Sequence, residues 1–586
     1  MHYRTRAIGV LALLACGFTV ISAKLVQIQL IKHDEYRKLA IKNHLRSEVI
    51  PPQRGAIYDS DGNLMAETQT RTDLRLDGKL VDAPADELPK LADLLQIPLS
   101  DLAQKFDQRK RDIPVAENLD DTMVTKLRAL KWKFLIFQPH DERFYPNNEL
   151  ASHILGYVGS DGHGDAGIEK EMDDALTGVP GQRWVERDAL SHEIAGYQAA
   201  ETPAVPGFDV TLTIRSSIQH VVENELDQIM QTYTPKAAYI IVMDPHTGEI
   251  MAMGSRPCYD PNDSKTFTQD NVRNRCITDG VEPGSIFKII TLAGALNEGK
   301  MSLQTPIFCE NGSFPYGGKI LHDDEPEGHG TLAAEEVLAV SSNIGFAKIA
   351  LNYLGQDKLY KYATAFGIGS KTGVLTQQSE SSGIFRPVSR WSALSITRVP
   401  MGQEVLATPI QMIAAMSVIA NGGRLVVPRL VEKVADDTGH VMKIYQPRVV
   451  RQVISPDTAE QVTKALEQVT VDGTAKKIKI EDANGARWSY AGKTGTAQKF
   501  VDGAYSHTKF VASFLGFMPA EDPAFVTLVM VDEPHGKYYG AEVAAPSFAN
   551  VGKQIAQIIN LQPDIAAPTH VMTAPALSTA STQESL

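Results

Sequence analysis

A single uncharged, apolar run close to the N-terminus limits what this chain can fold into more than any other feature. The run covers residues 7–23 (AIGVLALLACGFTVISA) and lies between Arg6 and Lys24. At about 1.5 Å per helical residue it would extend roughly 26 Å, which just crosses the hydrocarbon core of a bilayer. Residues 25–31 (LVQIQLI) continue the apolar character but include two glutamines. We therefore expect a transmembrane anchor and juxtamembrane helix over 7–31.

The charges beside this run set the expected topology. The stub 1–6 carries Arg4 and Arg6, and a basic flank favours the cytoplasmic side of a membrane. No second segment reaches transmembrane length, which predicts a single-pass protein with a large body on the outer side. Two alternatives stay open: a cleavable signal peptide ending near Ala23, and a lipoprotein signal at Cys16. The anchor and both alternatives would each place the body on the outer side of the membrane.

Composition narrows the functional classes. The 586 residues are 43% hydrophobic and 22% charged, which suits several folded cores rather than a disordered chain. The formal net charge of −13 argues against a protein that binds duplex nucleic acid, because such a protein needs a basic face to displace phosphate counterions. The four cysteines show neither C-x-x-C spacing nor a disulfide framework, so a structural zinc site is disfavoured.

The first part of the body, over about 40–230, is expected to form one N-terminal domain. Short alternating runs such as 72–76 (TDLRL) and 209–214 (DVTLTI) predict strands, and residues 98–109 predict a helix. The stretch 156–167 (GYVGSDGHGDAG) is too rich in glycine for either element and predicts a loop.

The pattern changes near residue 235 and predicts a second domain over 235–562. The apolar runs 238–243 (AYIIVM) and 250–254 (IMAMG) flank a turn and predict a pair of strands. Helical stretches follow, and later apolar runs such as 525–532 predict further strands. We therefore expect an α+β fold in which helices cover an antiparallel sheet. Residues 563–586, rich in Ala, Ser, Thr and Pro, predict a disordered tail.

The first candidate catalytic motif is PGSIFK, which contains Ser285 and Lys288 and precedes the apolar run IITLAGAL. Proline and glycine before a helix-forming run predict a helix start, and a spacing of three places both side chains on one face. A serine hydroxyl becomes a useful nucleophile when a neighbouring base takes its proton, and a lysine neutralised by burial can do so. Taken alone, S-x-x-K is common by chance and more often marks a solvated helix face.

The second motif is Ser341, Ser342 and Asn343, between VLAV and IGFAKIA. The change from one helical stretch to the next predicts a helix boundary or an inter-helix loop at this position. Serine and asparagine are ordinary capping residues, so a helix cap explains the triplet when it is considered by itself.

The third motif is Lys493, Thr494, Gly495 and Thr496, which follow WSYAG. Small residues around a lysine on a strand edge let a substrate backbone approach closely and pair with the strand. An ordinary polar turn with a solvated lysine is the plain alternative for this motif as well.

Two similar patterns are set aside. Lys493 follows a glycine, as in a phosphate-binding loop, but G-x-x-x-x-G-K-[ST] needs glycine at position 487, where this chain has Arg487. A second Lys-Thr-Gly at 371–373 lies in the loop-like GIGSKTGVL without a downstream strand, so we treat it as a coincidence.

The order of the three motifs is more specific than any one of them. S-x-x-K, S-D-N and K-T-G occur together in penicillin-binding proteins and class A β-lactamases. The same order is found here, with Ser342 where that pattern has aspartate. The chain therefore resembles the class B penicillin-binding proteins over roughly residues 40–560. Its C-terminal stretches near 532–546 resemble the division-specific, FtsI-like branch of that family. Further similar stretches are RGAIYD at 54–59, RFYP at 143–146, GIE at 167–169, YDPN at 259–262, TPIQ at 408–411, DEP at 532–534 and AAP at 544–546.

This resemblance implies a fold and a function. It implies an anchor in the bacterial cytoplasmic (inner) membrane, an elongated pedestal domain of the dimerisation type, and a transpeptidase domain with a serine β-lactamase-like fold. It also implies a DD-transpeptidase that cross-links peptidoglycan stem peptides through a serine acyl-enzyme in septal wall synthesis and is a target of β-lactams. Implied partners are donor and acceptor stem peptides, a polytopic glycan polymerase and other division membrane proteins, with no nucleic acid.

The resemblance implies residue roles as well. Ser285 is expected to be the nucleophile and Lys288 its general base, with Ser341 and Lys493 completing the catalytic set. No metal and no organic cofactor are implied. The residues expected to bind the substrate are Asn343, Thr494, Gly495 and Thr496.

Four other functions are weighed against this one. A serine β-lactamase shares the motifs but has no use for a pedestal and an anchor. A β-lactam sensor would need extra membrane spans and a cytoplasmic signalling domain. A transpeptidase of side-wall elongation and a catalytically silent division scaffold are the remaining alternatives, and the intact motifs disfavour the scaffold.

Overall fold

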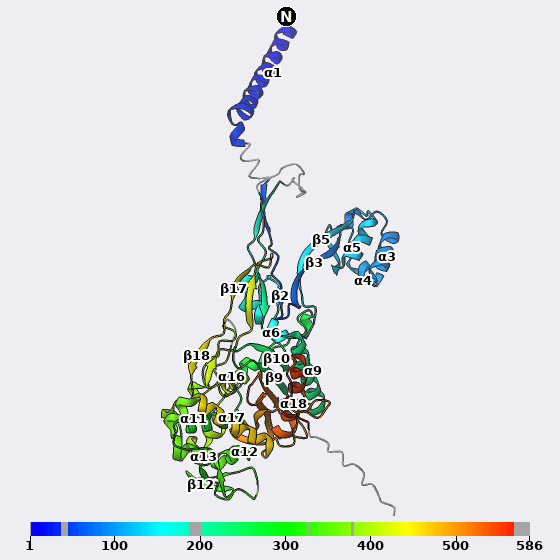
Figure 1. Ribbon diagram of the computed structural model, residues 1–586. Coiled ribbons are helices and arrows are strands. Elements are labelled where there is room, and N and C mark those ends of the chain that lie inside the picture. Colours follow the sequence, from blue (N-terminus) through cyan, green and yellow to red (C-terminus); the bar gives the residue numbers. More distant parts are fainter. Residues whose placement is uncertain (1, 37–44, 187–200, 326, 377–379, 568–586) are drawn as a thin grey trace, which may run out of the picture. The chain divides into compact units, whose positions relative to one another are not determined.

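The computed structural model describes residues 2–36, 45–186, 201–325, 327–376 and 380–567 (Figure 1). The chain divides into two compact units. One contains the chain up to Gly55 together with Asp174–Phe208, and the other contains Ala56–Asp173 and the chain from Asp209 onward.

The first unit holds the apolar N-terminal helix and a small sheet. Helix α1 (His2–Val26) continues as a π-helical turn, Gln27–Ile31. Its stretch Tyr3–Ile31 is the one helix of the described chain that is long and apolar enough to cross a membrane, which confirms the predicted apolar helix. The sheet is antiparallel, in the order β1 (Leu45–Ile50), β6 (Gly181–Glu186) and β7 (Glu201–Thr202).

The N-terminal part of the second unit is built on the long strand β3 (Leu64–Leu76). Leu74 and Leu76 of β3 are fully buried in a cluster with Leu91 and Leu127 from the neighbouring helices. This cluster is the core of a small helical lobe. Its elements are α3 (Pro84–Leu95), α4 (Leu99–Lys105), β4 (Ile113–Leu119), α5 (Asp121–Ala129) and β5 (Leu135–Phe144).

Strand β3 also joins a longer sheet, whose order is β17-β16-β8-β2-β3-β4 with β5 paired to β3. The predicted strands at 72–76 and 209–214 correspond to β3 and β8, and 156–166 form the predicted loop. The predicted helix 98–109 ends early, at Lys105, because Phe106 takes an extended backbone and packs against the leucine cluster. The other strands are β2 (Ile57–Tyr58), β8 (Asp209–Leu212), β16 (Val431–Ala435) and β17 (Val441–Ile444).

Three sequence stretches that resemble the family are joined by two sets of polar contacts. Arg143 of RFYP lies 2.7 Å from Glu169 of GIE, with 6% and 0% of the side chains exposed. The backbone N–H of Tyr145 donates to Asn262 of YDPN at 3.0 Å, and the Asn262 amide donates back to the Tyr145 carbonyl at 2.9 Å. Removing one partner of such a buried pair leaves a desolvated charge, so these stretches depend on one another.

The C-terminal part of the second unit is built on a five-stranded antiparallel sheet in the order β10-β9-β21-β20-β19. Every residue of β9, β10 and β21 is buried. Strand β19 is one edge of this sheet, so one side of its backbone is open to other partners. The strands are β9 (Ala237–Met243), β10 (Ile250–Arg256), β19 (Ala491–Val501), β20 (Ala504–Met518) and β21 (Phe525–Asp532).

Helices cover this sheet, as predicted for an α+β fold. Helices α9 (Ser216–Tyr233) and α18 (Gly540–Ile558) lie side by side and contact the sheet (Figure 1). Helix α16 (Pro409–Ala420) is buried at every position and contacts both β21 and α17 (Pro456–Val471). Helix α9 begins in the stretch expected to belong to the N-terminal domain, yet it packs on β9 and β10.

Shorter elements complete this part of the second unit. The stretches 306–322 and 331–349 carry a small hairpin and two helices. Of the expected tail, Ile565 still pairs with Arg487, whereas 568–586 lie outside the described residues. The elements are α10 (Arg275–Thr278), α11 (Lys288–Asn297), β11 (Pro306–Phe308), β12 (Ser313–Tyr316), β13 (Lys319–His322), β14 (Thr331–Ala333), α12 (Ala334–Ala339), α13 (Asn343–Ile349), α14 (Gln356–Ala365), α15 (Ser395–Arg398), β15 (Arg424–Val426) and β18 (Val449–Gln452).

Two glycines set the position of the loop before α11. Gly284 and Gly402 both have left-handed backbones, with φ of 57° and 80°, and the Gly284 N–H donates to the Gly402 carbonyl at 3.3 Å. A Cβ at position 402 would lie 2.3 Å from the Gly284 carbonyl oxygen. The two backbones can approach this closely only because Gly402 carries no side chain.

Gly402→Ala is therefore expected to destabilise the protein by well over the roughly 1–2 kcal/mol that a left-handed alanine costs. The matched control is Gly299→Ala, because Gly299 has φ of 65° but a Cβ added there would meet nothing within 4 Å. Calorimetric unfolding of the purified full-length variants measures the loss of stability in each of them. Equal losses in the two variants would show that the backbone contact at Gly284 does not constrain the loop.

Candidate active site

Ser285 lies on a single 3₁₀ turn that leads into a buried helix. The turn is Gly284–Phe287, and α11 begins directly after it at Lys288. Side chains three residues apart in a 3₁₀ turn lie above one another, so Ser285 and Lys288 share a side as the sequence predicted. Ser285 is half-buried, whereas Lys288 is 0% exposed.

The amine of Lys288 joins the first two motifs. Its Nζ donates to the Ser341 carbonyl at 2.6 Å, to Ser341 Oγ at 3.1 Å and to Asn343 Oδ1 at 2.8 Å. Within the described part of the chain, no hydrogen bond connects Lys288 Nζ to Ser285 Oγ. The ammonium is thus fully occupied by the second motif while it lies next to the first.

The second motif is a helix boundary, as predicted. Ser341 has φ of 61°, an uncommon left-handed backbone for serine, and Ser342 caps α13 by accepting from the Gly345 N–H at 2.9 Å. Ser342 Oγ also donates to Asp323 at 2.8 Å, and the Ile344 N–H donates to the same carboxylate at 3.0 Å. Asp323 therefore fixes the turn that carries Ser341. The sequence reasoning missed Asp323, because an aspartate in an Asp-Asp-Glu run resembles a solvated charge.

The third motif lies on β19, at the sheet edge where the sequence placed it. Lys493 is 0% exposed, and its Nζ donates to the Thr494 carbonyl at 3.2 Å. The hydroxyls of Thr494 and Thr474 are 2.7 Å apart, and Thr496 Oγ1 accepts from the Gly540 N–H at 3.0 Å. Thr494 and Thr496 thus share one face of the strand and line a cavity, whereas the Lys493 amine is buried. Thr474 gave no signal in the sequence.

Gly495 has a structural reason to be a glycine. A Cβ at this position would lie 2.3 Å from Ser513 Oγ and 3.2 Å from a methyl carbon of Ile286. The missing side chain therefore lets β19 lie against both β20 and the turn of Ser285. The small residue at 495 is thus explained by the packing of protein atoms and not by the approach of a substrate backbone, which the sequence predicts.

Burial controls the charge of both lysines. Desolvation lowers the pKa of Lys288 to about 8, although the carboxylates of Asp324 and Asp323 favour its charged form. Desolvation also lowers the pKa of Lys493 far below its usual value, and the nearby Lys288 ammonium lowers it further. Near neutral pH these amines can exchange protons with neighbouring hydroxyls, which an ordinary solvated lysine does not do readily.

The motifs line one cleft with two arms. One arm has a volume of about 600 Å³ and is lined by residues that include Asn343 and Gln498. The other has about 560 Å³ and is lined by residues that include Ser341 and Thr494. Ser285 and Thr496 line both arms, so the nucleophile candidate lies where they meet. Asp324 and Tyr539 line both arms as well.

The second Lys-Thr-Gly lies elsewhere. Lys371 is exposed, and it lines neither arm of the cleft. The backbone N–H groups of Thr372 and Gly373 donate to the buried Glu380 at 2.5 and 2.9 Å. These bonds give the triplet a role in shaping its own loop.

Two family descriptions match the chain. Residues 238–553 match the penicillin binding protein transpeptidase domain, and residues 49–212 match the penicillin-binding protein dimerisation domain. The first match alone covers more than half of the chain.

Full-length relatives and solved structures agree with these matches. The chain is 33% identical to stage V sporulation protein D of Bacillus subtilis over 96% of its own length and 86% of that protein. It is 28% identical to the peptidoglycan D,D-transpeptidase FtsI of Escherichia coli, over 94% of its own length and 91% of that protein.

Among solved structures, penicillin binding protein 2X of Streptococcus thermophilus has the same fold, with a TM-score of 0.73 at 23% identity over 88% of this chain and 80% of that one. Penicillin binding protein 3 of Mycobacterium tuberculosis, in complex with aztreonam, has a TM-score of 0.67 at 25% identity. The match covers 89% of this chain and 100% of that one. The chain therefore belongs to the class B penicillin-binding proteins, the serine D,D-transpeptidases of peptidoglycan synthesis.

Proposed function

We propose that Ser285 attacks the carbonyl carbon between the two terminal D-alanines of a donor stem peptide, and that Lys288 takes its proton. The observation that carries this proposal is the buried Lys288 amine, one turn from Ser285 and bonded to Ser341 and Asn343. Its lowered pKa gives it a neutral fraction at physiological pH, which a general base requires.

The remaining motif residues complete the reaction. The C–N bond to the last D-alanine breaks, and its nitrogen receives the proton through Ser341 with support from Lys493. The backbone N–H groups of Ser285 and Thr496 stabilise the oxyanion, an effect often worth a few kcal/mol. An acceptor amine then attacks the Ser285 ester and releases the serine. Asn343, Thr494, Gly495 and Thr496 hold the donor peptide and its carboxylate.

The cellular role that we propose is septal cross-linking during division, in the inner membrane, with the body on the outer side. Similarity to FtsI of Escherichia coli and the single apolar N-terminal helix support it. A polytopic glycan polymerase and other division membrane proteins are the proposed partners. The relative named as a sporulation protein favours a second candidate, cross-linking in spore formation. Depletion of the protein in growing cells distinguishes the two roles. Filamentous cells would indicate a role in division, whereas normal growth with a loss of spores would indicate a role in spore formation.

Ser285→Ala is expected to abolish covalent labelling by penicillin, because the change removes the only hydroxyl proposed to form the acyl-enzyme. Intact-protein mass spectrometry of the purified full-length protein, followed by peptide mapping, measures the adduct. A wild-type adduct on another residue, or an adduct that persists in the variant, would rule out this nucleophile.

The rate of β-lactam acylation is expected to rise with pH through about 8, where Lys288 loses its proton and becomes a base. Asp324→Asn removes a carboxylate that favours the ammonium, so the midpoint should move to lower pH. Asp357→Asn, at an exposed acid on α14, is the control and should leave it unchanged. A midpoint that stays fixed or rises in Asp324→Asn would contradict the assignment of the base.

Lys493→Ala is expected to slow acylation by orders of magnitude, because the variant loses the buried amine that supports Ser341 in the proposed proton transfer. Lys371→Ala should stay within about threefold of wild type, as expected for an exposed charge. Stopped-flow acylation with a chromogenic cephalosporin compares the two. Equal effects, or the reverse order, would place the active-site strand at the other Lys-Thr-Gly.

A further inference from the structure

A second cavity adjoins the catalytic cleft. This rear cavity has a volume of about 820 Å³ and shares Glu282, Ala497 and Gln498 with one arm of the cleft. Its wall also includes Lys499 and Phe500, the next residues of β19. A peptide that pairs with β19 at the third motif and continues along the strand would therefore reach the rear cavity directly.

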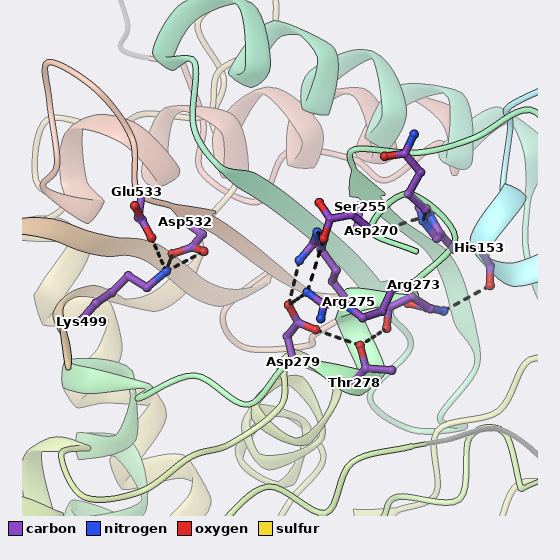
Figure 2. A network of polar contacts seen from close by, with 12 residues as sticks. His153, Ser255, Asp270, Arg273, Arg275, Thr278, Asp279, Lys499, Asp532 and Glu533 are labelled. Carbon is purple, nitrogen blue, oxygen red and sulfur yellow. Dashed lines mark hydrogen bonds and ion pairs between the residues drawn. The ribbon is translucent and has the colours of Figure 1, made fainter. Parts of the chain in front are cut away.

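Most charged groups in the wall of the rear cavity already have partners. Lys499 points toward Asp532 and Glu533 and lies 2.7 Å from each of them, as Figure 2 shows. Arg273 and Arg275 both reach Asp279, at 3.1 Å each (Figure 2). These groups neutralise one another and leave little net charge.

Two cations in the wall are uncommitted. Lys236, just before β9, and Arg386, in the loop after Ile384, are exposed, and among the described residues neither side chain has an ion pair or a hydrogen bond. In addition, Arg275 is 2% exposed, and its Nε has no acceptor within the described part of the chain. Two positive charges from separate segments thus face the same cavity and are available to an anion.

Glu282, the acidic residue that the rear cavity shares with the cleft, does not cancel these two positive charges. One oxygen of Glu282 accepts from the Glu404 N–H at 2.8 Å and from the Tyr505 hydroxyl at 3.1 Å. Burial raises the pKa of Glu282, which disfavours its negative charge. Glu404 is paired with Arg398 at 3.2 Å. The cavity therefore offers positive charge to a ligand.

We propose that the rear cavity binds a carboxylate of the donor stem peptide upstream of D-Ala-D-Ala, and that Lys236 and Arg386 supply the cations. This inference rests on the proposed function, because the terminal carboxylate at Thr494 and Thr496 sets the direction of the peptide. A strand advances about 3.3 Å per residue, so the two or three residues before D-Ala-D-Ala would run beside residues 497–500. Free carboxylates in that part of a stem peptide would meet the two cations.

The test uses two soluble thioester peptides that mimic the donor and differ in one group. One carries a free carboxylate on the residue two positions before the scissile carbonyl, and the other carries the carboxamide there. The second-order rate constant for acylation of Ser285 is measured for each peptide and for penicillin. The proteins are the full-length wild type, the double variant Lys236→Ala/Arg386→Ala, and the control Arg390→Ala, an exposed arginine that does not line the cavity.

The double variant is expected to lose about tenfold in rate with the carboxylate peptide, as two solvent-accessible ion pairs would imply. Its rates with the carboxamide peptide and with penicillin should stay within about twofold of wild type, and Arg390→Ala should match wild type throughout. An equal loss with both peptides, or no loss with the carboxylate peptide, would overturn the inference. Failure of penicillin and both peptides to acylate wild-type Ser285 would instead overturn the proposed function, and this inference with it.

Discussion

The burial of two lysine amines in one site is the constraint on which the catalytic domain depends. Moving an ammonium out of water costs several kcal/mol unless hydrogen bonds replace its hydration. Lys288 obtains these bonds from Ser341 and Asn343, so the turn between α12 and α13 must lie against the start of α11. Lys493 lies close enough for Lys288 to lower its pKa. The Lys288 ammonium thereby makes Lys493 easier to neutralise, and burial does the same for both amines, which suits them to moving protons.

Holding this arrangement requires support that lies outside the three motifs. Ser341 has a left-handed backbone, which is unfavourable for serine, and Asp323 offsets that cost by binding both Ser342 and the Ile344 N–H. Gly402 allows the loop of Ser285 to approach closely enough to complete the site. The motif residues therefore have their geometry only because distant segments fix it.

Strand β19 carries both the third motif and part of the wall of the rear cavity. As the edge of the sheet it carries the third motif on residues 493–496 and continues into the wall of the rear cavity on 497–500. A donor peptide that extends along this edge would be bound in two places. The hydroxyls near Ser285 would contact its end, and Lys236 and Arg386 would contact a carboxylate farther along the peptide. The same physical feature, an unpaired strand edge, would serve both proposed purposes.

The sequence by itself determined the apolar N-terminal helix, the strands β9, β10 and β21, and the order of the three motifs, because hydrophobic periodicity and motif spacing are local properties. It also predicted a helix boundary or an inter-helix loop at residues 341–343 and a strand edge at Lys493. Only the tertiary structure decided that Lys288 bonds to Ser341, that Gly495 accommodates Ser513 and Ile286, and that Asp323, Thr474 and the rear cavity belong near the site. These relations join residues far apart in the chain, and no local pattern encodes such contacts.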